Sequence, residues 1–124
     1  MQSIKPKTFE AWIGGFLGPS YRLELTEDGL LYETYEHGYE LYASELLLPT
    51  TAQWSRFLND VAVSGVWEWD GRYRGAEAVD ATTWYVAIEA GSRTIVSRGL
   101  NHYPPGFVDF LRCVRRLLDG RNFS

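Results

Sequence analysis

The chain has 124 residues, of which 45% are hydrophobic and 23% charged, a composition typical of one globular domain covering residues 1–124. Its net charge of −4 at pH 7 provides no overall positive field for phosphates, so we expect no nucleic-acid partner. No run of apolar residues approaches the roughly 20 that cross a bilayer, so we expect no membrane partner.

The first residues, MQSIKPKTFEAW, lack the long apolar core of a secretory signal, so we expect a cytoplasmic protein. The glycine-rich segment from Gly14 to Gly18 has neither the spacing nor the lysine of a phosphate-binding loop. We interpret it as a bend or bulge in a first strand.

Residues 20–48 have the pattern of an antiparallel meander. Apolar and polar side chains alternate from Tyr21 onward, and Asp28-Gly29 and His37-Gly38 are typical of two-residue hairpin turns. If Asp28 and Gly29 form the first turn, Leu25 lies opposite Tyr32 and Glu24 lies opposite Glu33. The second turn then places Leu41 opposite Thr34 and Ala43 opposite Tyr32.

Two amphipathic helices are predicted, near residues 50–64 and 105–119. The first begins with a capping box, Thr50-x-x-Gln53, and its apolar residues recur at helical spacing: Trp54, Phe57, Leu58 and Val61. The second lies between Pro104-Pro105 and Gly120, with one apolar stripe: Phe107, Phe110, Leu111, Val114, Leu117 and Leu118.

Between the helices, alternation predicts further strands. Trp67, Trp69 and Tyr73 are expected to share one face of a strand and to fill the core. Residues 82–89 predict another strand, which Gly91-Ser92 turns into a partner over residues 93–98. Residues 71–80, with glycines and small side chains, are expected to form a flexible connection.

The predicted fold is therefore α+β, a two-layer sandwich in which two helices cover an antiparallel sheet of about six strands. In each half of the chain a hairpin precedes an amphipathic helix. This pattern also fits the duplication of one hairpin-plus-helix unit, an alternative that the sequence leaves open.

Short motifs in both halves resemble small bacterial domains of unknown function. The opening FEAWIGGFLGPSY (residues 9–21), followed by Asp28-Gly29 and Tyr32, resembles domains in which a glycine-containing strand leads to Tyr, a strand, a DG turn and another Tyr. The second half is similar through Trp67-x-Trp69 with Tyr73, Thr82-Thr83-Trp84 and Ser97-x-Gly99-x-Asn101-x-Tyr103-Pro104. The resemblance implies a bacterial α+β domain and implies no activity.

Neither a metal nor another cofactor is expected. His37 and His102 are the only imidazoles, and neither has a second histidine or a cysteine at ligand spacing. Cys113 is the single cysteine, which excludes an internal disulfide, and its position beside the apolar stripe of the last helix indicates packing.

The first candidate binding surface contains Glu24, Glu33, Tyr35 and Tyr42. In the predicted register Glu24 faces Glu33, with Tyr42 next across the sheet and with Arg22, Tyr35 and Glu40 around them. Two facing carboxylates can share a proton or a hard metal. The simpler interpretation is a solvated outer face, where such a pair is tolerated.

The second candidate is the loop that leaves the last strand and enters the final helix, with Arg98, Asn101, His102 and Tyr103. Binding groups concentrate in such loops, and free amides at a helix start suit an anion. Alternatively, Asn101 supports a turn and Tyr103 sets the entrance of the helix.

No catalytic residue stands out, so we expect a non-enzymatic protein-binding or regulatory domain. Residues 1–49 contain 3 basic and 8 acidic side chains, a balance that favours a basic protein partner. The alternative is a small enzyme or ligand-binding domain that uses the loop from Arg98 to Tyr103 with a carboxylate such as Asp70 or Asp80.

Overall fold

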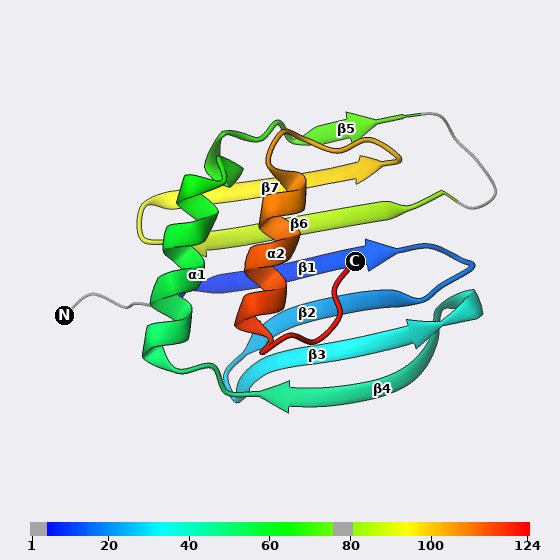
Figure 1. The fold of residues 1–124 in the computed structure, drawn as a ribbon, viewed down its shortest axis with the longest axis horizontal. Helices are drawn as coiled ribbons and strands as arrows, with labels where there is room; N and C mark the ends of the chain where they lie inside the picture. Colours follow the sequence, from blue (N-terminus) through cyan, green and yellow to red (C-terminus); the bar gives the residue numbers. More distant parts are fainter. Residues whose placement is uncertain (1–4, 76–80) are drawn as a thin grey trace.

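A seven-stranded sheet covered on one face by two helices makes up the structure (Figure 1). The computed structural model describes residues 5–75 and 81–124. The strands are β1 (Thr8–Gly14), β2 (Ser20–Thr26), β3 (Gly29–Glu36), β4 (Glu40–Leu47), β5 (Arg72–Arg74), β6 (Thr83–Ala90) and β7 (Arg93–Leu100). The helices are α1 (Thr51–Val63) and α2 (Phe107–Leu117), with short 3₁₀ turns η1 (His37–Tyr39) and η2 (Val66–Glu68).

The strand order is β4-β3-β2-β1-β6-β7-β5. All neighbours pair antiparallel except β5 and β7, which run parallel at one edge. The α+β class and the antiparallel-dominated sheet are confirmed, with seven strands in place of about six. Within the described ranges, neither α-helix has the length and apolar character that crossing a bilayer requires.

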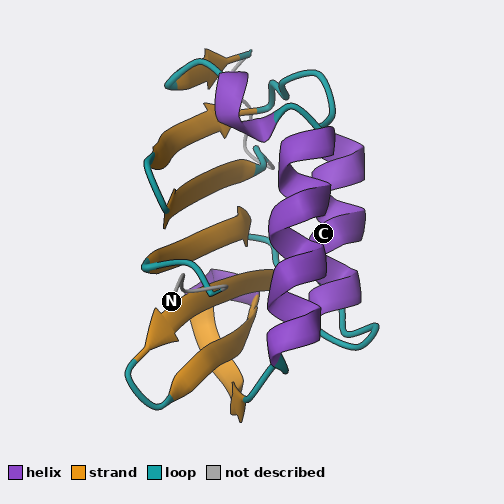
Figure 2. Ribbon diagram, turned by 90° about the vertical axis from the view of Figure 1, so that its left-hand side faces the viewer, coloured by secondary structure: helices purple, strands orange, loops and turns teal. Residues whose placement is uncertain are grey.

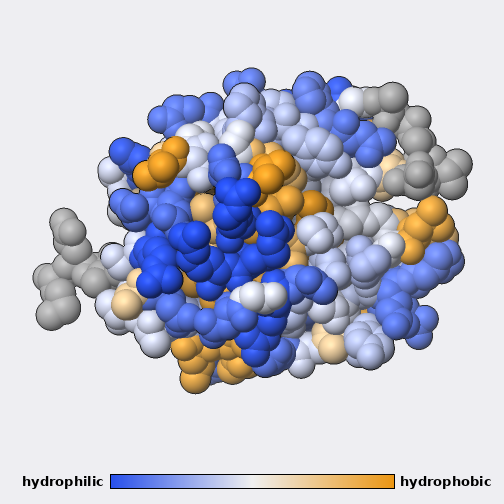
Figure 3. Space-filling model, in the orientation of Figure 1, coloured by the Kyte–Doolittle hydropathy of each residue, from blue (hydrophilic) through white to orange (hydrophobic). Residues whose placement is uncertain are grey.

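The core lies between the sheet and the helices (Figure 2). Alternation decides which strand residues enter it: Phe9, Ala11 and Ile13 of β1 and Trp84, Val86 and Ile88 of β6 are buried. The outer surface of the helix layer is largely hydrophilic (Figure 3). Among residues 5–75 and 81–124, no helix or further strand layer covers the opposite face of the sheet (Figure 2).

Both helices form where their capping and apolar patterns predict. Thr50 Oγ1 accepts a hydrogen bond from the Gln53 amide at 3.1 Å, and Gln53 Oε1 accepts one from the Thr50 amide at 2.7 Å, so the capping box is confirmed. Trp54, Phe57 and Val61 of α1 are buried. Five of the six predicted stripe residues of the second helix are buried, and Leu111 is partly buried.

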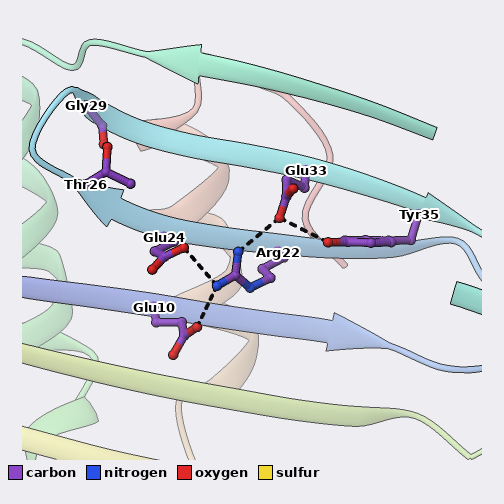
Figure 4. A network of polar contacts seen from close by, with 7 residues as sticks. All are labelled: Glu10, Arg22, Glu24, Thr26, Gly29, Glu33 and Tyr35. Carbon is purple, nitrogen blue, oxygen red and sulfur yellow. Dashed lines mark hydrogen bonds and ion pairs between the residues drawn. The ribbon is translucent and has the colours of Figure 1, made fainter. Parts of the chain in front are cut away.

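The predicted register of the first hairpin is wrong by two residues. Leu25 pairs with Leu30, and Leu23 pairs with Tyr32. The chain turns through Glu27 and Asp28 because the Thr26 hydroxyl accepts from the Asp28 amide at 3.2 Å and donates to the Gly29 carbonyl at 2.9 Å (Figure 4). A shift of two residues keeps every side chain on its predicted face.

The second hairpin differs for a related reason. The turn includes the three residues of η1, and β4 carries a bulge, so that Thr34 pairs with Ala43 while Tyr35 pairs with Leu41. The predicted pairing of Leu41 with Thr34 is therefore wrong. Tyr42 is the extra residue that the bulge leaves without a partner in this pairing.

The strand predicted from Trp67 to Tyr73 is largely absent. Gly65 has a left-handed backbone (φ 79°) and leads into η2, so Trp67 and Trp69 do not share a strand face. Trp69 is buried and its indole N–H donates to the Pro105 carbonyl at 2.9 Å. The expected flexible connection contains β5, and its residues 76–80 lie outside the described residues.

The glycine-rich segment ends the first strand instead of bending it. Gly14 is the last residue of β1, and the amide of Gly18 donates to the Gly15 carbonyl at 2.9 Å in the turn that follows. A Cβ atom at Gly14 would lie 2.0 Å from Ser20 Oγ, so this position accepts no larger side chain without rearrangement.

Candidate functional site on the open face of the sheet

The face of the sheet opposite the helices, which we call the open face, carries the outward-pointing side chains of the strands. On β1 these are Thr8, Glu10 and Trp12, which alternate with the buried Phe9, Ala11 and Ile13. The same alternation places Arg22 and Glu24 of β2 and Glu33 and Tyr35 of β3 on this face.

Arg22 lies at the centre of an acidic cluster on the open face, which we define as Glu10, Arg22, Glu24, Glu33 and Tyr35 (Figure 4). Its Nη2 atom donates to Glu10 and to Glu24 at 2.9 Å each, and its Nη1 atom donates to Glu33 at 3.0 Å. The Tyr35 hydroxyl donates to the same oxygen of Glu33 at 3.0 Å. Three carboxylates against one guanidinium leave the cluster with a net charge of −2.

The surroundings of Arg22 and Tyr35 keep these two groups in fixed protonation states. Partial burial alone would lower the pKa of the Arg22 guanidinium, but hydrogen bonds to Glu24, Glu33 and Glu10 outweigh it and raise that pKa above its ordinary value. Burial, and then the hydrogen bond to Glu33, raise the pKa of the Tyr35 phenol. Arg22 therefore remains a cation and Tyr35 a neutral donor at physiological pH.

The directly facing carboxylate pair predicted from the sequence is not present. Arg22 pairs with Glu33 across the strands, and Glu24 pairs with Leu31. Glu24 and Glu33 therefore contact the same guanidinium from different positions instead of facing each other. Among residues 5–75 and 81–124 no group of three or more histidines, cysteines or carboxylates is arranged to hold a metal ion.

The side chains of the cluster differ in their access to solvent. The side chains of Glu10 and Glu24 are 41% and 44% exposed, whereas that of Glu33 is only 14% exposed. Glu10 and Glu24 can therefore contact an incoming partner, and Glu33 mainly holds Arg22 and Tyr35 in position.

An exposed aromatic group borders the acidic cluster. The Trp12 ring lies 5.4 Å from that of Tyr35 and 6.0 Å from that of Tyr39, and Tyr39 also contacts Phe16. Tyr39 and Phe16 are 48% and 50% exposed. Tyr42, the extra residue of the bulge in the edge strand β4, is 69% exposed.

The second predicted group does not converge on one point. Arg98 lies on the open face with its guanidinium 5.3 Å from the Tyr85 ring centroid. Asn101 has a left-handed backbone and its Oδ1 accepts from the Thr82 amide at 2.8 Å, as the turn-supporting interpretation predicts. The His102 carbonyl accepts from the Trp84 indole at 2.8 Å, and Tyr103 packs on Phe107.

Asp70 and Asp80 were the carboxylates suggested as helpers for that loop. Asp70 is exposed, and its backbone carbonyl accepts a hydrogen bond from the Ser97 hydroxyl. Asp80 lies outside the described residues.

Cys113 packs in the core, as its position in the helix predicts. It is 8% exposed, and burial raises the pKa of its thiol, a shift that a contact with the Ser64 hydroxyl only partly opposes. A buried, protonated thiol is a poor nucleophile, which agrees with a packing role.

Arg22 was expected beside Glu24 and Glu33, but Glu10 and Trp12 were not predicted as part of the site. The signal that could have located them is the alternation of Thr8, Glu10 and Trp12 with apolar residues, which marks one face of a strand. No local pattern shows that this strand lies between β2 and β6, however, and that position is what brings Glu10 to Arg22.

Replacing Arg22 with glutamine is expected to lower the free energy of unfolding at pH 7 by about 1–2 kcal/mol, because three carboxylates would then lie together without their cation. At about 1 M salt the repulsion among these carboxylates is screened, so the difference from the wild type should shrink. Urea unfolding at low and high salt measures this. Arg112→Gln, which removes an exposed cation paired with Asp109, is the control and should change stability by less than about 0.5 kcal/mol. Equal losses for Arg22→Gln at the two salt concentrations would contradict an electrostatic role.

Comparison with protein-family models and with curated proteins found no match to this chain. The function of the open face is therefore argued from its geometry and charge.

Proposed function

We propose that this chain is a non-enzymatic domain that binds a basic protein partner through the acidic cluster and the aromatic group beside it. The observation that carries the proposal is the net charge of −2 at the acidic cluster, on a sheet face that no helix of the described part of the chain covers. Carboxylates held in place by Arg22 need little ordering when a partner arrives, which lowers the entropic cost of binding.

The neighbouring aromatic rings favour a protein partner over a simple cation. Trp12, Tyr35 and Tyr39 form a connected group of rings whose centroids lie 5.4 and 6.0 Å apart. Tyrosine and tryptophan give large contact areas with little loss of side-chain entropy, and they are enriched among residues that dominate interface energetics. Arginine and lysine of a partner can pair with Glu10 or Glu24 and stack on these rings.

Removing the two exposed carboxylates tests the proposal. The double variant Glu10→Gln/Glu24→Gln is expected to bind a captured and purified partner about tenfold more weakly at low salt, mainly through slower association. Its residual binding should depend less on ionic strength, because fewer charges remain to be screened. Glu33 is left intact because it holds Arg22 and Tyr35.

Glu68→Gln/Asp109→Asn is the matched control, since it removes the same charge from exposed positions outside the open face. Surface plasmon resonance at several salt concentrations compares the three proteins. If the control weakens binding as much as the double variant, net charge and not the cluster is responsible. If the double variant binds as the wild type does, the proposed surface is wrong.

A further inference from the structure

A row of side chains crosses the open face from β3 to β5. The strand register places these residues next to one another in order: Glu33, Arg22, Trp12, Tyr85, Arg98 and Arg72. The first two belong to the acidic cluster, and Trp12 and Tyr85 are the aromatic middle of the row. The last two are arginines, so the two ends of the row differ in chemistry.

The arginine end of the row lines a hollow of about 400 Å³ on the open face. Its lining includes Trp12, Arg72, Thr83, Tyr85, Arg98 and Leu100. A volume of this size falls in the range of pockets for small organic ligands. The hollow thus combines an indole, a phenol ring and an aliphatic side chain with three cations, Arg72, Arg74 and Arg98.

The two arginines of the row, Arg72 and Arg98, differ from Arg22 in their surroundings. They occupy adjacent positions on β5 and β7, and Arg98 is stacked over Tyr85 at 5.3 Å. Within the described ranges no carboxylate forms an ion pair with either of them, whereas Arg112, Arg116 and Arg121 each have one. Like charges at directly opposed positions destabilise a sheet, and an anion between them would remove that cost.

We propose that this hollow binds a small planar organic anion, a ring that bears a phosphate or a carboxylate. The anionic group lies between Arg72 and Arg98, and the ring lies against Trp12 and Leu100. A guanidinium presents a planar set of donors that matches both phosphate and carboxylate. A nucleic-acid strand fits less well, because an extended polyanion along this face would meet the carboxylates of the acidic cluster.

Isothermal titration calorimetry at low salt tests the site with adenosine monophosphate, benzoate, adenosine and inorganic phosphate as probes. At least one of the two ring-bearing anions is expected to bind, and more tightly than adenosine or inorganic phosphate. Which of the two binds better distinguishes a phosphate from a carboxylate ligand. Arg72→Gln and Arg98→Gln are each expected to weaken that binding by about tenfold or more, the loss of one charge-assisted contact.

Arg112→Gln is the matched control because it removes one exposed arginine charge from α2, outside the open face. It should bind the same probe as tightly as the wild type. The proposal is overturned if neither ring-bearing anion binds at millimolar concentration, or if inorganic phosphate binds as tightly as they do. It is also overturned if the control variant loses as much affinity as Arg98→Gln.

Discussion

Phe110→Ala is expected to lower the free energy of unfolding by about 3–5 kcal/mol. Phe110 has no exposed surface and lies at the centre of the helix–sheet interface, where its ring meets that of Trp69 edge-on at 5.4 Å. Truncation removes apolar contact on several sides and leaves a cavity that a two-layer domain of this size fills only partly. For a domain of about 120 residues, such a loss should lower the melting temperature by well over ten degrees.

Chemical denaturation of two further α2 variants tests which face of the helix is buried. Leu111 is only partly buried, so Leu111→Ala should lose about 1–2 kcal/mol, and the exposed Val108→Ala should stay within about 0.5 kcal/mol of the wild type. Similar losses for all three would mean that α2 does not bury the face described here.

Gly99→Ala is expected to destabilise the domain by about 1–3 kcal/mol, an effect of overpacking. A Cβ atom at Gly99 would lie 2.1 Å from the Trp84 indole nitrogen and 2.6 Å from the His102 carbonyl oxygen. These two atoms are joined by a hydrogen bond of 2.8 Å, so the added methyl group must displace the indole or break that bond. Trp84 is among the largest fully buried side chains, and its movement would disturb the core around it.

Gly71→Ala is the matched control, because a Cβ atom there would approach only the Val96 carbonyl, at 3.7 Å. Its free energy of unfolding should stay within about 0.5 kcal/mol of the wild type. Near-ultraviolet circular dichroism gives a second readout, since Gly99→Ala should alter the tryptophan signal and Gly71→Ala should not. Equal stability of the two variants would show that Trp84 can adjust without cost.

The buried faces of α1, α2 and β6 could be predicted from the sequence alone. The capping box at Thr50 and Gln53, the apolar stripe of α2 and the alternation in β6 are set by interactions within a few residues, so they act in any tertiary context. The two-layer α+β class followed from these patterns, because two helices with one apolar stripe each need a sheet to cover.

Two features depended on contacts that no local pattern contains. The hairpin register was decided by the Thr26 hydroxyl, which closes the turn one residue earlier on each strand than Asp28-Gly29 suggested. The segment with Trp67 and Trp69 alternates like a strand, but burial of Trp69 against Pro105 and Phe110 favours η2. Both outcomes depend on free-energy differences equal to those of a few hydrogen bonds or contacts. The strand and turn propensities of single residues are too imprecise to predict such differences.

The candidate site was also predicted in part from local patterns and decided in part by tertiary contacts. Glu24, Glu33 and Tyr35 were placed on an outer face correctly, because a register error of two residues preserves the face of every side chain. The position of β1 between β2 and β6 brings Glu10 to Arg22, so that Arg22 lies among three carboxylates. The same position lets Trp12 continue the row toward Arg98. Strand order is fixed by packing between residues far apart in the chain, so the sequence determined which side chains face outward and the tertiary structure determined which of them meet.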